Sequence, residues 1–197
     1  MNARLVQRRI FGAALLILGA ALLVRAAYIP AKAALAQVLL ERAWTKVQAG
    51  DLLAKPWPWA DIRPLAMIEV PRLHRRSIIL EGASGAAMAF GPGHMTNSPP
   101  IGAPGTAVIA AHRDTQFAFL GALSPGDKIR VTTAQGRALD FQVTAARIVR
   151  ADASGIDPDA KGESRLALVT CYPFTGVLHS TWRYVVLADL AKPLPGA

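Results

Sequence analysis

The feature that most constrains the fold is a series of short apolar segments between residues 65 and 190, bounded by Gly, Pro and Asp. Several segments alternate apolar and polar residues with a period of two, which is typical of β-strands with one buried face. The sequence shows no long helical pattern between them, whereas a parallel sheet needs crossover helices between its strands. The pattern therefore predicts a mostly antiparallel β-barrel or β-sandwich of about 130 residues.

Seven segments are predicted to be strands, with one hairpin turning at Gln135-Gly136. They are residues 66–73, 77–82, 106–114, 128–135, 138–149, 165–173 and 183–190.

A second constraint lies at the N-terminus, where an almost purely apolar segment runs from Ile10 to Ile29 and only Arg25 interrupts it. This is about the 20 residues that a helix needs to cross a bilayer. Three arginines precede the segment, which favours an orientation with the N-terminus inside. We expect an uncleaved membrane anchor. A cleaved signal peptide with a site near residues 31–33 and a buried core helix are the alternatives.

Composition excludes several classes of protein. Hydrophobic residues make up 52% and charged residues 18% of the 197, which excludes a disordered chain. The single cysteine excludes a disulfide-stapled mini-protein and a four-cysteine zinc site. The net charge is +9, but four of the arginines precede residue 31, so the remainder is only mildly basic. We therefore expect no nucleic-acid partner.

The segment that joins the two regions is predicted to be a helix over residues 31–50, with Gly50 after its C-terminus, followed by a proline-rich linker up to residue 64. The helix either packs on the following domain or acts as a stalk above the membrane. Trp57 and Trp59 are expected to cover part of a core, with the membrane interface as their alternative position.

Three residues that can carry out chemistry fall at the ends of predicted strands: His112, Cys171 and Arg183. A thiolate is a strong nucleophile, and an imidazole can take its proton and return it to a leaving amine. A guanidinium can stabilise an oxyanion. The three are sufficient for acyl transfer from a peptide bond, although each also has a plain structural interpretation as a packed or surface residue.

The sequence around these residues resembles the sortase family of cysteine transpeptidases. The resemblance rests on HRDTQF (112–117), LVTCYPF (168–174) and WRYVV (182–186), and it extends over about residues 65–190. The N-terminal anchor, the helix after it and the KPWPWAD segment are most similar to the Gram-negative (proteobacterial) sortase class. Ala111 and Gly105-Thr106 depart from the usual pattern, which has Gly before the histidine and Gly-Asn in the strand.

The resemblance implies a mainly β fold, a closed barrel of about eight strands with short helices. It implies that Cys171 cleaves an LPXTG-like sorting signal after Thr and forms a thioester. His112 acts as acid and base, Arg183 stabilises the oxyanion, and Thr170 contacts the substrate or the oxyanion. His179, in the loop between the Cys171 and Arg183 strands, is a further candidate for substrate contact. This chemistry requires no metal ion and no organic cofactor.

The implied partners are a substrate protein with an LPXTG-like signal and an amine acceptor. The implied location is the inner (cytoplasmic) membrane, with a single span and a periplasmic catalytic domain. The expected division is an anchor (1–30), a stalk and linker (31–64), a catalytic barrel (65–191) and a tail (192–197). Two alternatives remain: a degenerate sortase-like module for binding or assembly, and an L,D-transpeptidase of peptidoglycan, whose Ser-x-Gly-Cys motif is not present around Cys171.

Overall fold

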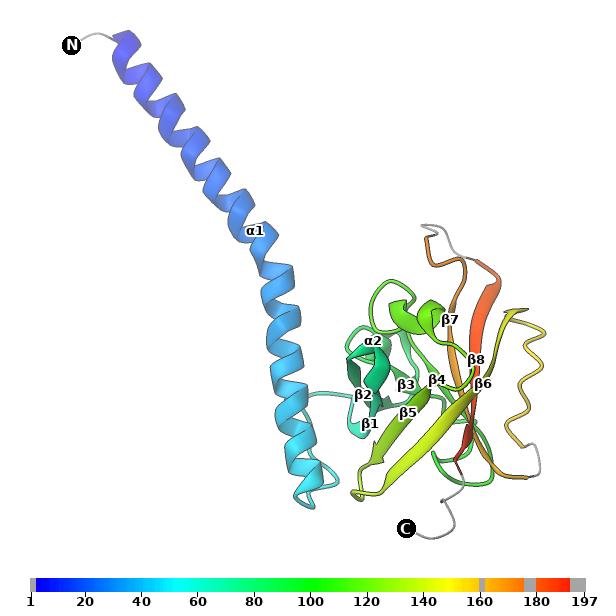
Figure 1. Ribbon diagram of the computed structural model, residues 1–197. Coiled ribbons are helices and arrows are strands. Elements are labelled where there is room, and N and C mark those ends of the chain that lie inside the picture. Colours follow the sequence, from blue (N-terminus) through cyan, green and yellow to red (C-terminus); the bar gives the residue numbers. More distant parts are fainter. Residues whose placement is uncertain (1–2, 160–161, 176–179, 192–197) are drawn as a thin grey trace. The chain divides into compact units, whose positions relative to one another are not determined.

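A computed structural model describes residues 3–159, 162–175 and 180–191 (Figure 1). The chain divides into two units, Met1–Val38 and Leu39–Ala197. Helix α1 spans Ala3–Gln48 and has Pro30 inside it, so the predicted anchor and the predicted stalk helix form one continuous helix.

The first unit contains the apolar part of α1. From Phe11 onward this helix is long and apolar enough to cross a membrane by length and composition, as a signal sequence also is. Its large apolar side chains are exposed, with Leu16 at 77% and Leu23 at 72%. Such exposure on a helix is the pattern expected of a segment that meets lipid.

The second unit is a closed barrel with the strand order β1-β2-β3-β4-β7-β8-β6-β5, which excludes the sandwich and confirms the barrel (Figure 1). All seven predicted segments contain strands, and the two-residue β3 adds an eighth that the sequence pattern did not predict. The strands are β1 Pro64–Val70, β2 Arg75–Glu81, β3 Gly93–His94, β4 Gly105–Ala110, β5 Lys128–Thr133, β6 Ala138–Arg150, β7 Ser164–Cys171 and β8 Trp182–Leu190. Three short helices connect them: η1 Pro71–Leu73, α2 Gly85–Met88 and η2 Ala118–Ala122.

Most neighbouring strands are antiparallel, but β4 and β7 pair in parallel, with Gly105 opposite Ser164 and Ala110 opposite Val169. A parallel pair brings the C-terminal ends of both strands to the same end of the barrel. The predicted hairpin between β5 and β6 is confirmed, and Gly136 occupies its turn with a positive φ of 76° that favours glycine.

The barrel interior is filled by inward-facing side chains, among which Phe141, Ile79 and Leu168 are completely buried. Phe117 is also completely buried, and it comes from the connection between β4 and η2. A loop residue in the core fixes the backbone beside it, because moving that loop would expose a large aromatic surface to water.

A second apolar cluster lies outside β1 and β2. Leu40, Trp44 and Val47 from the end of α1 belong to it, together with Met67 and Leu80 from the barrel. The prediction that this helix packs on the following domain is therefore confirmed for its last turns. Burial of these side chains stabilises the attachment by roughly 1.5–3 kcal/mol for each large apolar group.

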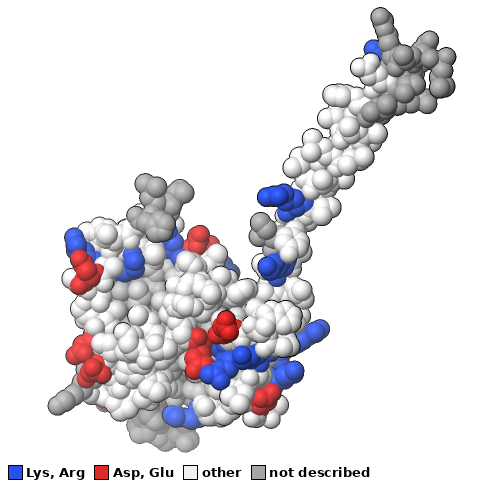
Figure 2. Space-filling view, turned by 180° about the vertical axis from the view of Figure 1, so that it is seen from behind, with Lys and Arg blue, Asp and Glu red and all other residues white. Residues whose placement is uncertain are grey.

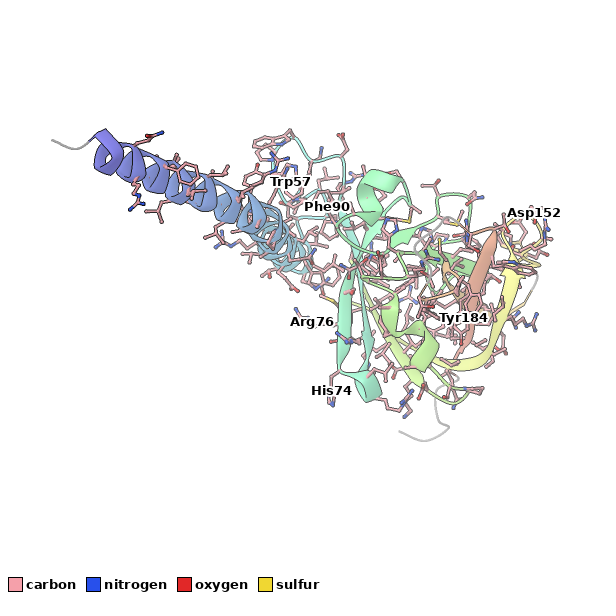
Figure 3. The ribbon with its side chains drawn as sticks, turned by 90° about the horizontal axis from the view of Figure 1, so that it is seen from above. Trp57, His74, Arg76, Phe90, Asp152 and Tyr184 are labelled. Carbon is pink, nitrogen blue, oxygen red and sulfur yellow. The ribbon has the colours of Figure 1, made fainter. Side chains whose placement is uncertain are left out.

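The two linker tryptophans have different environments. Trp57 packs against the cluster outside β1 and β2, and its ring lies 5.3 Å from that of Phe90 in an edge-to-face arrangement (Figure 3). Trp59 is 80% exposed, so the prediction that it covers a core is wrong. The Ala60 N–H donates to the Trp57 carbonyl at 3.0 Å, and the resulting turn places Pro58 and Trp59 at its two central positions, where Trp59 meets solvent.

Charged side chains on the barrel are interleaved. Figure 2 shows Lys and Arg next to Asp and Glu on the face in view. The ion pairs of the barrel include Arg63 with Glu81 and Arg130 with Asp140. Exposed pairs of this kind contribute about 0–1 kcal/mol each.

Candidate active site

Cys171 and Arg183 are directly opposite each other in the ladder of β7 and β8. Directly opposite residues of an antiparallel pair have Cβ atoms about 4.5–5.5 Å apart and point to the same face. The two residues are the last and the second residue of their strands. The ladder therefore places a thiol and a guanidinium side by side at one end of the barrel.

His112 reaches the same place from β4. The parallel register ends with Ala110 opposite Val169, and the Ala111 N–H extends it by donating to the Val169 carbonyl at 3.2 Å. Continuing the register by two residues brings His112 alongside Cys171. The Phe117 N–H donates to the His112 carbonyl at 3.0 Å, which fixes the chain where it leaves the strand.

The three residues lie on the outer face of the barrel. Their neighbours in sequence, Ala111, Thr170 and Tyr184, pack on the interior core. Side chains alternate between the two faces of a strand, so the next residue on each strand points outward. Cys171 and Arg183 are partly exposed and His112 is exposed, which leaves the group accessible to a substrate.

Thr170 has a different environment from the one predicted. Its side chain is 2% exposed, and its hydroxyl donates to the Ala111 carbonyl at 2.7 Å. This hydrogen bond joins the residue before Cys171 to the residue before His112. In this structure the hydroxyl therefore links two strands, and the contact of Thr170 with a substrate remains a prediction. His179 lies outside the described residues.

Further contacts, which the sequence analysis did not identify, hold the loops around Cys171. Arg113 Nη1 donates to the Pro173 carbonyl at 2.9 Å, joining the loop after His112 to the loop after Cys171. The rings of Tyr172, Phe174 and Tyr184 pack together with centroids 5.2–6.2 Å apart. The aromatic residues in the CYPF sequence (171–174) are the local pattern that indicates this packing, because aromatic rings that pack together restrict the motion of the backbone beside them.

Arg183 is itself oriented by the loop before β8. Its Nη1 donates to the carbonyls of Ser180 at 2.6 Å and of Trp182 at 2.9 Å. Both bonds use the same nitrogen. Among the described residues, the donors on Nε and Nη2 have no acceptor, so they remain available to a bound molecule.

A groove with a volume of about 310 Å³ runs from Arg183 along the outer face of β4 and β7. We call it the apolar groove. One wall is the connection between β6 and β7, where Ile156 packs on the outer side of the sheet. The groove is lined by Met95, Asn97, Val108, Ala110, Ala151, Ser154, Ile156, Pro158, Val169 and Arg183. Most of these side chains are apolar, and Arg183 is the one charged residue among them.

His94 is buried in β3, where its Nε2 lies 2.9 Å from the Pro99 carbonyl oxygen, so its role is structural. Within residues 3–159, 162–175 and 180–191, the structure brings together no three His, Cys, Asp or Glu side chains that could hold a metal ion.

Comparison with known proteins agrees with this geometry. The family model described as "Sortase domain" matches residues 68–191, which is more than half of the chain. Sortase D of Bacillus subtilis (strain 168) is 30% identical over 120 residues, covering 61% of this chain and 60% of that protein. The chain thus matches less than two thirds of the length of that relative.

Solved structures show the same fold. The SrtA sortase from Actinomyces oris has a TM-score of 0.59 and 28% identity, covering 66% of this chain and 80% of that one. Sortase A from Corynebacterium diphtheriae, with a TM-score of 0.60 and 24% identity over 82% of this chain and 86% of that chain, supports the fold alone. From the matched barrel and the matched sequence, we conclude that this chain belongs to the sortase family.

Proposed function

We propose that this protein is a membrane-anchored cysteine transpeptidase that cleaves an LPXTG-like sorting signal after Thr and transfers the acyl group to an amine. The observation that carries the proposal is the convergence of Cys171, His112 and Arg183 on the outer face of one barrel end, reached through two strand ladders. The match to the sortase family gives this convergence its chemical meaning.

The first step is acylation of Cys171. Its thiolate attacks the Thr carbonyl carbon of the sorting signal, a C–S bond forms, and the carbonyl electrons move onto the oxygen. When the oxyanion collapses, the C–N bond to the following residue breaks. His112, in its protonated form, donates a proton to that leaving amine, and a thioester on Cys171 remains.

Arg183 stabilises the charge that develops on the oxygen. Its position opposite Cys171 brings the guanidinium to the atom under attack, and the bonds to Ser180 and Trp182 restrict its motion. A donor oriented before the reaction loses little energy through reorganisation when charge appears. Its Nε and Nη2 donors, which have no acceptor among the residues that the structure describes, supply the hydrogen bonds.

The second step reverses the path with a different amine. The acceptor amine attacks the thioester, His112 takes its proton, a new amide bond forms and the Cys171 thiolate leaves. Water in place of the amine would give hydrolysis. Every bond made or broken involves only the substrates and the Cys171 sulfur, so the chemistry requires no metal ion and no cofactor.

The apolar groove is the proposed site for the sorting signal. Val108, Ile156 and Val169 offer aliphatic surface to Leu and Pro side chains, and the groove ends at Arg183 where the Thr carbonyl must lie. Thr170 and His179 were predicted to contact the same substrate. The Thr170 hydroxyl acts on this site through its bond to Ala111.

We further propose the Gram-negative sortase class, a single inner-membrane span and a periplasmic barrel. The support is the apolar part of α1, the three preceding arginines and the KPWPWAD segment. The division at residues 30, 64 and 191 belongs to the same proposal. An uncleaved anchor would keep the enzyme at the surface where exported substrates emerge.

The test uses residues 31–197 with an LPXTG-type peptide and an amine, read by mass spectrometry. We expect a thioester on Cys171 and a Thr-amine product. In Cys171→Ala both should fall to background, a loss of at least about 10³-fold, because no other thiol is present. Turnover by Cys171→Ala would refute the mechanism.

A folded wild-type protein whose Cys171 resists alkylation and forms no thioester would favour the degenerate binding module instead. His112→Ala serves as the second variant, since it removes the base and keeps the nucleophile. We expect it to lose nearly as much turnover as Cys171→Ala.

A further inference from the structure

A second hollow lies near the end of the barrel that carries His112, and the proposed function does not yet use it. Its volume is about 230 Å³, and its walls come from the start of β2 and from the loop that follows His112. We call it the arginine hollow. Its lining residues are Arg75, Arg76, Ser77, Thr115, Gln116, Ala118 and Phe119.

The arginine hollow and the apolar groove flank β4 on opposite sides. In the barrel order, β7 and β8 follow β4 on one side, whereas β3 and β2 follow it on the other. Figure 3 shows Arg76 beside the strands at one edge of the barrel and Tyr184, whose ring packs on the interior core, farther along on β8. Thr115 and Gln116 are three and four residues after His112, so the hollow borders the loop that begins at the catalytic base.

The lining groups of the hollow are mostly hydrogen-bond donors. The Ser77 hydroxyl donates to Gln116 Oε1 at 2.9 Å, and among the described residues the Gln116 amide nitrogen has no acceptor. Arg76 is neutralised by Glu41, to which its Nη2 donates at 2.7 and 2.8 Å. Among the described residues, no carboxylate pairs with Arg75, which is exposed. The hollow thus holds one uncompensated guanidinium beside two neutral donors, Gln116 and Thr115.

An uncompensated guanidinium with amide and hydroxyl donors nearby is suited to a carboxylate. Attack of the acceptor amine on the thioester is the chemical reverse of the departure of the first amine. By microscopic reversibility, the incoming amine therefore approaches along the path on which the first amine leaves. The sorting signal fills the groove on the β7 side of His112. The amine component must therefore approach from elsewhere around His112, and the arginine hollow lies on the β2 side.

We propose that the arginine hollow binds a carboxylate of the amine acceptor, with Arg75 as the principal contact and Gln116 as the second. This inference rests on the proposed transpeptidase function and names the chemical class of its second substrate, an amine that also carries a carboxylate. Arg75 is then a specificity-determining residue for the acceptor and has no part in thioester formation.

The test compares two acceptors, a diglycine peptide with a free C-terminal carboxylate and the same peptide with a C-terminal amide. With the wild-type enzyme we expect a lower KM for the acid than for the amide. Arg75→Gln should raise the KM for the acid about 5- to 10-fold and that for the amide less than 2-fold, because one charge-assisted contact is lost. Thioester formation should not change.

The matched control is Arg137→Gln, which removes the same charge from an exposed arginine. Arg137 lies in the turn between β5 and β6, and the β1 register places that turn at the barrel end opposite Arg75. We expect no change in either KM. Gln116→Leu should reproduce a weaker form of the Arg75→Gln effect.

The outcomes separate this inference from the proposed function. If no thioester forms, the transpeptidase proposal fails. If the thioester forms but Arg75→Gln leaves the acid and amide acceptors equally good, the acceptor site is refuted and the transpeptidase stands. Arg75→Gln could instead change only the acylation rate, and only for substrates whose leaving segment is acidic. That result would also overturn the acceptor assignment and would mean that the arginine hollow binds the leaving peptide.

Discussion

The apolar groove and the arginine hollow border the same strand and differ in chemistry. The groove is walled by Val108, Val169 and Ile156 and has one charge, Arg183, among its lining residues. The hollow presents Arg75 together with amide and hydroxyl groups. An aliphatic peptide gains from the first environment through burial, and an anion gains from the second through paired charges.

In the proposed mechanism, the difference would let one cysteine act on two substrates in sequence. Each substrate would have its own recognition surface, and both would reach the Cys171 sulfur. A variant that acts on one surface should therefore change one half-reaction, whereas a variant at the shared residues should change both.

Among variants that keep Cys171 and His112, the largest effect is expected at Arg183. Arg183→Lys keeps the positive charge but loses the planar set of donors, so we expect thioester formation to slow about 10- to 100-fold. Burst kinetics with an LPXTG-type peptide would measure this rate. An Arg183→Lys variant that acylates at the wild-type rate would show that a positive charge alone is sufficient and that the oriented donors of the guanidinium are not needed.

A smaller effect is expected inside the apolar groove. Val169→Thr is isosteric and adds a hydroxyl, so we expect the KM of the sorting peptide to rise about 3- to 10-fold. The KM of the acceptor should not move. Equal changes in the KM of the sorting peptide and the KM of the acceptor would contradict the assignment of separate surfaces to the two substrates.

Thr170 tests what the two surfaces share. Thr170→Val removes the bond to the Ala111 carbonyl while keeping the shape, and we expect a loss of about 1–2 kcal/mol in the free energy of unfolding. The rates of acylation and of transfer should fall by the same factor as each other, because the Thr170 bond positions His112 and Cys171 relative to each other. Thr170→Ser retains the hydroxyl. It should therefore restore most of the stability in a denaturation assay and most of both rates in an activity assay.

The smallest effect concerns pH and the scaffold. Arg72 hydrogen-bonds the Asp127 carboxylate and holds its pKa below the usual value. A lowered pKa adds stability above the unfolded value of about 3.9, and the gain is lost as pH falls through the folded value. Urea titrations should find Asp127→Asn about 1 kcal/mol less stable at pH 7, and the difference should shrink progressively as pH falls below about 4.

That variant also sharpens the comparison. Asp127 lies in neither hollow, so the constants for both substrates should match those of the wild type at pH 7. A change in the acceptor KM would mean that the support around Arg72 contributes to the arginine hollow.

The sequence predicted much of the barrel because its strands carry alternating burial that a single chain displays directly. Seven segments, the hairpin at Gly136 and the helix that packs through Trp44 followed from period and turn chemistry. β3 could not be predicted, since two residues are too few to show a period. The exposure of Trp59 was also missed, because local composition does not say which of two nearby rings meets a core.

The site divides in the same way. Cys171, His112 and Arg183 were recognisable from motifs, and their positions at strand ends followed from the pattern. The proximity of His112 to the other two residues depends on the parallel register of β4 with β7, which involves residues far apart in sequence. The same long-range pairing produces two hydrogen bonds, from Thr170 to Ala111 and from Arg113 to Pro173. No local sequence pattern predicts either bond.

The parallel pairing of β4 and β7 also governs when reactivity can arise during folding. The linking bond spans 59 residues, and the strands between its ends, β5 and β6, pair with each other as a local hairpin. Long-range closure is slow compared with hairpin formation, because a long loop must be ordered before any contact forms. Until that closure Cys171 lacks the neighbouring His112 and Arg183 side chains that the proposed mechanism requires. If the periplasmic barrel that we propose is exported unfolded, its cysteine becomes the proposed nucleophile only after the barrel closes.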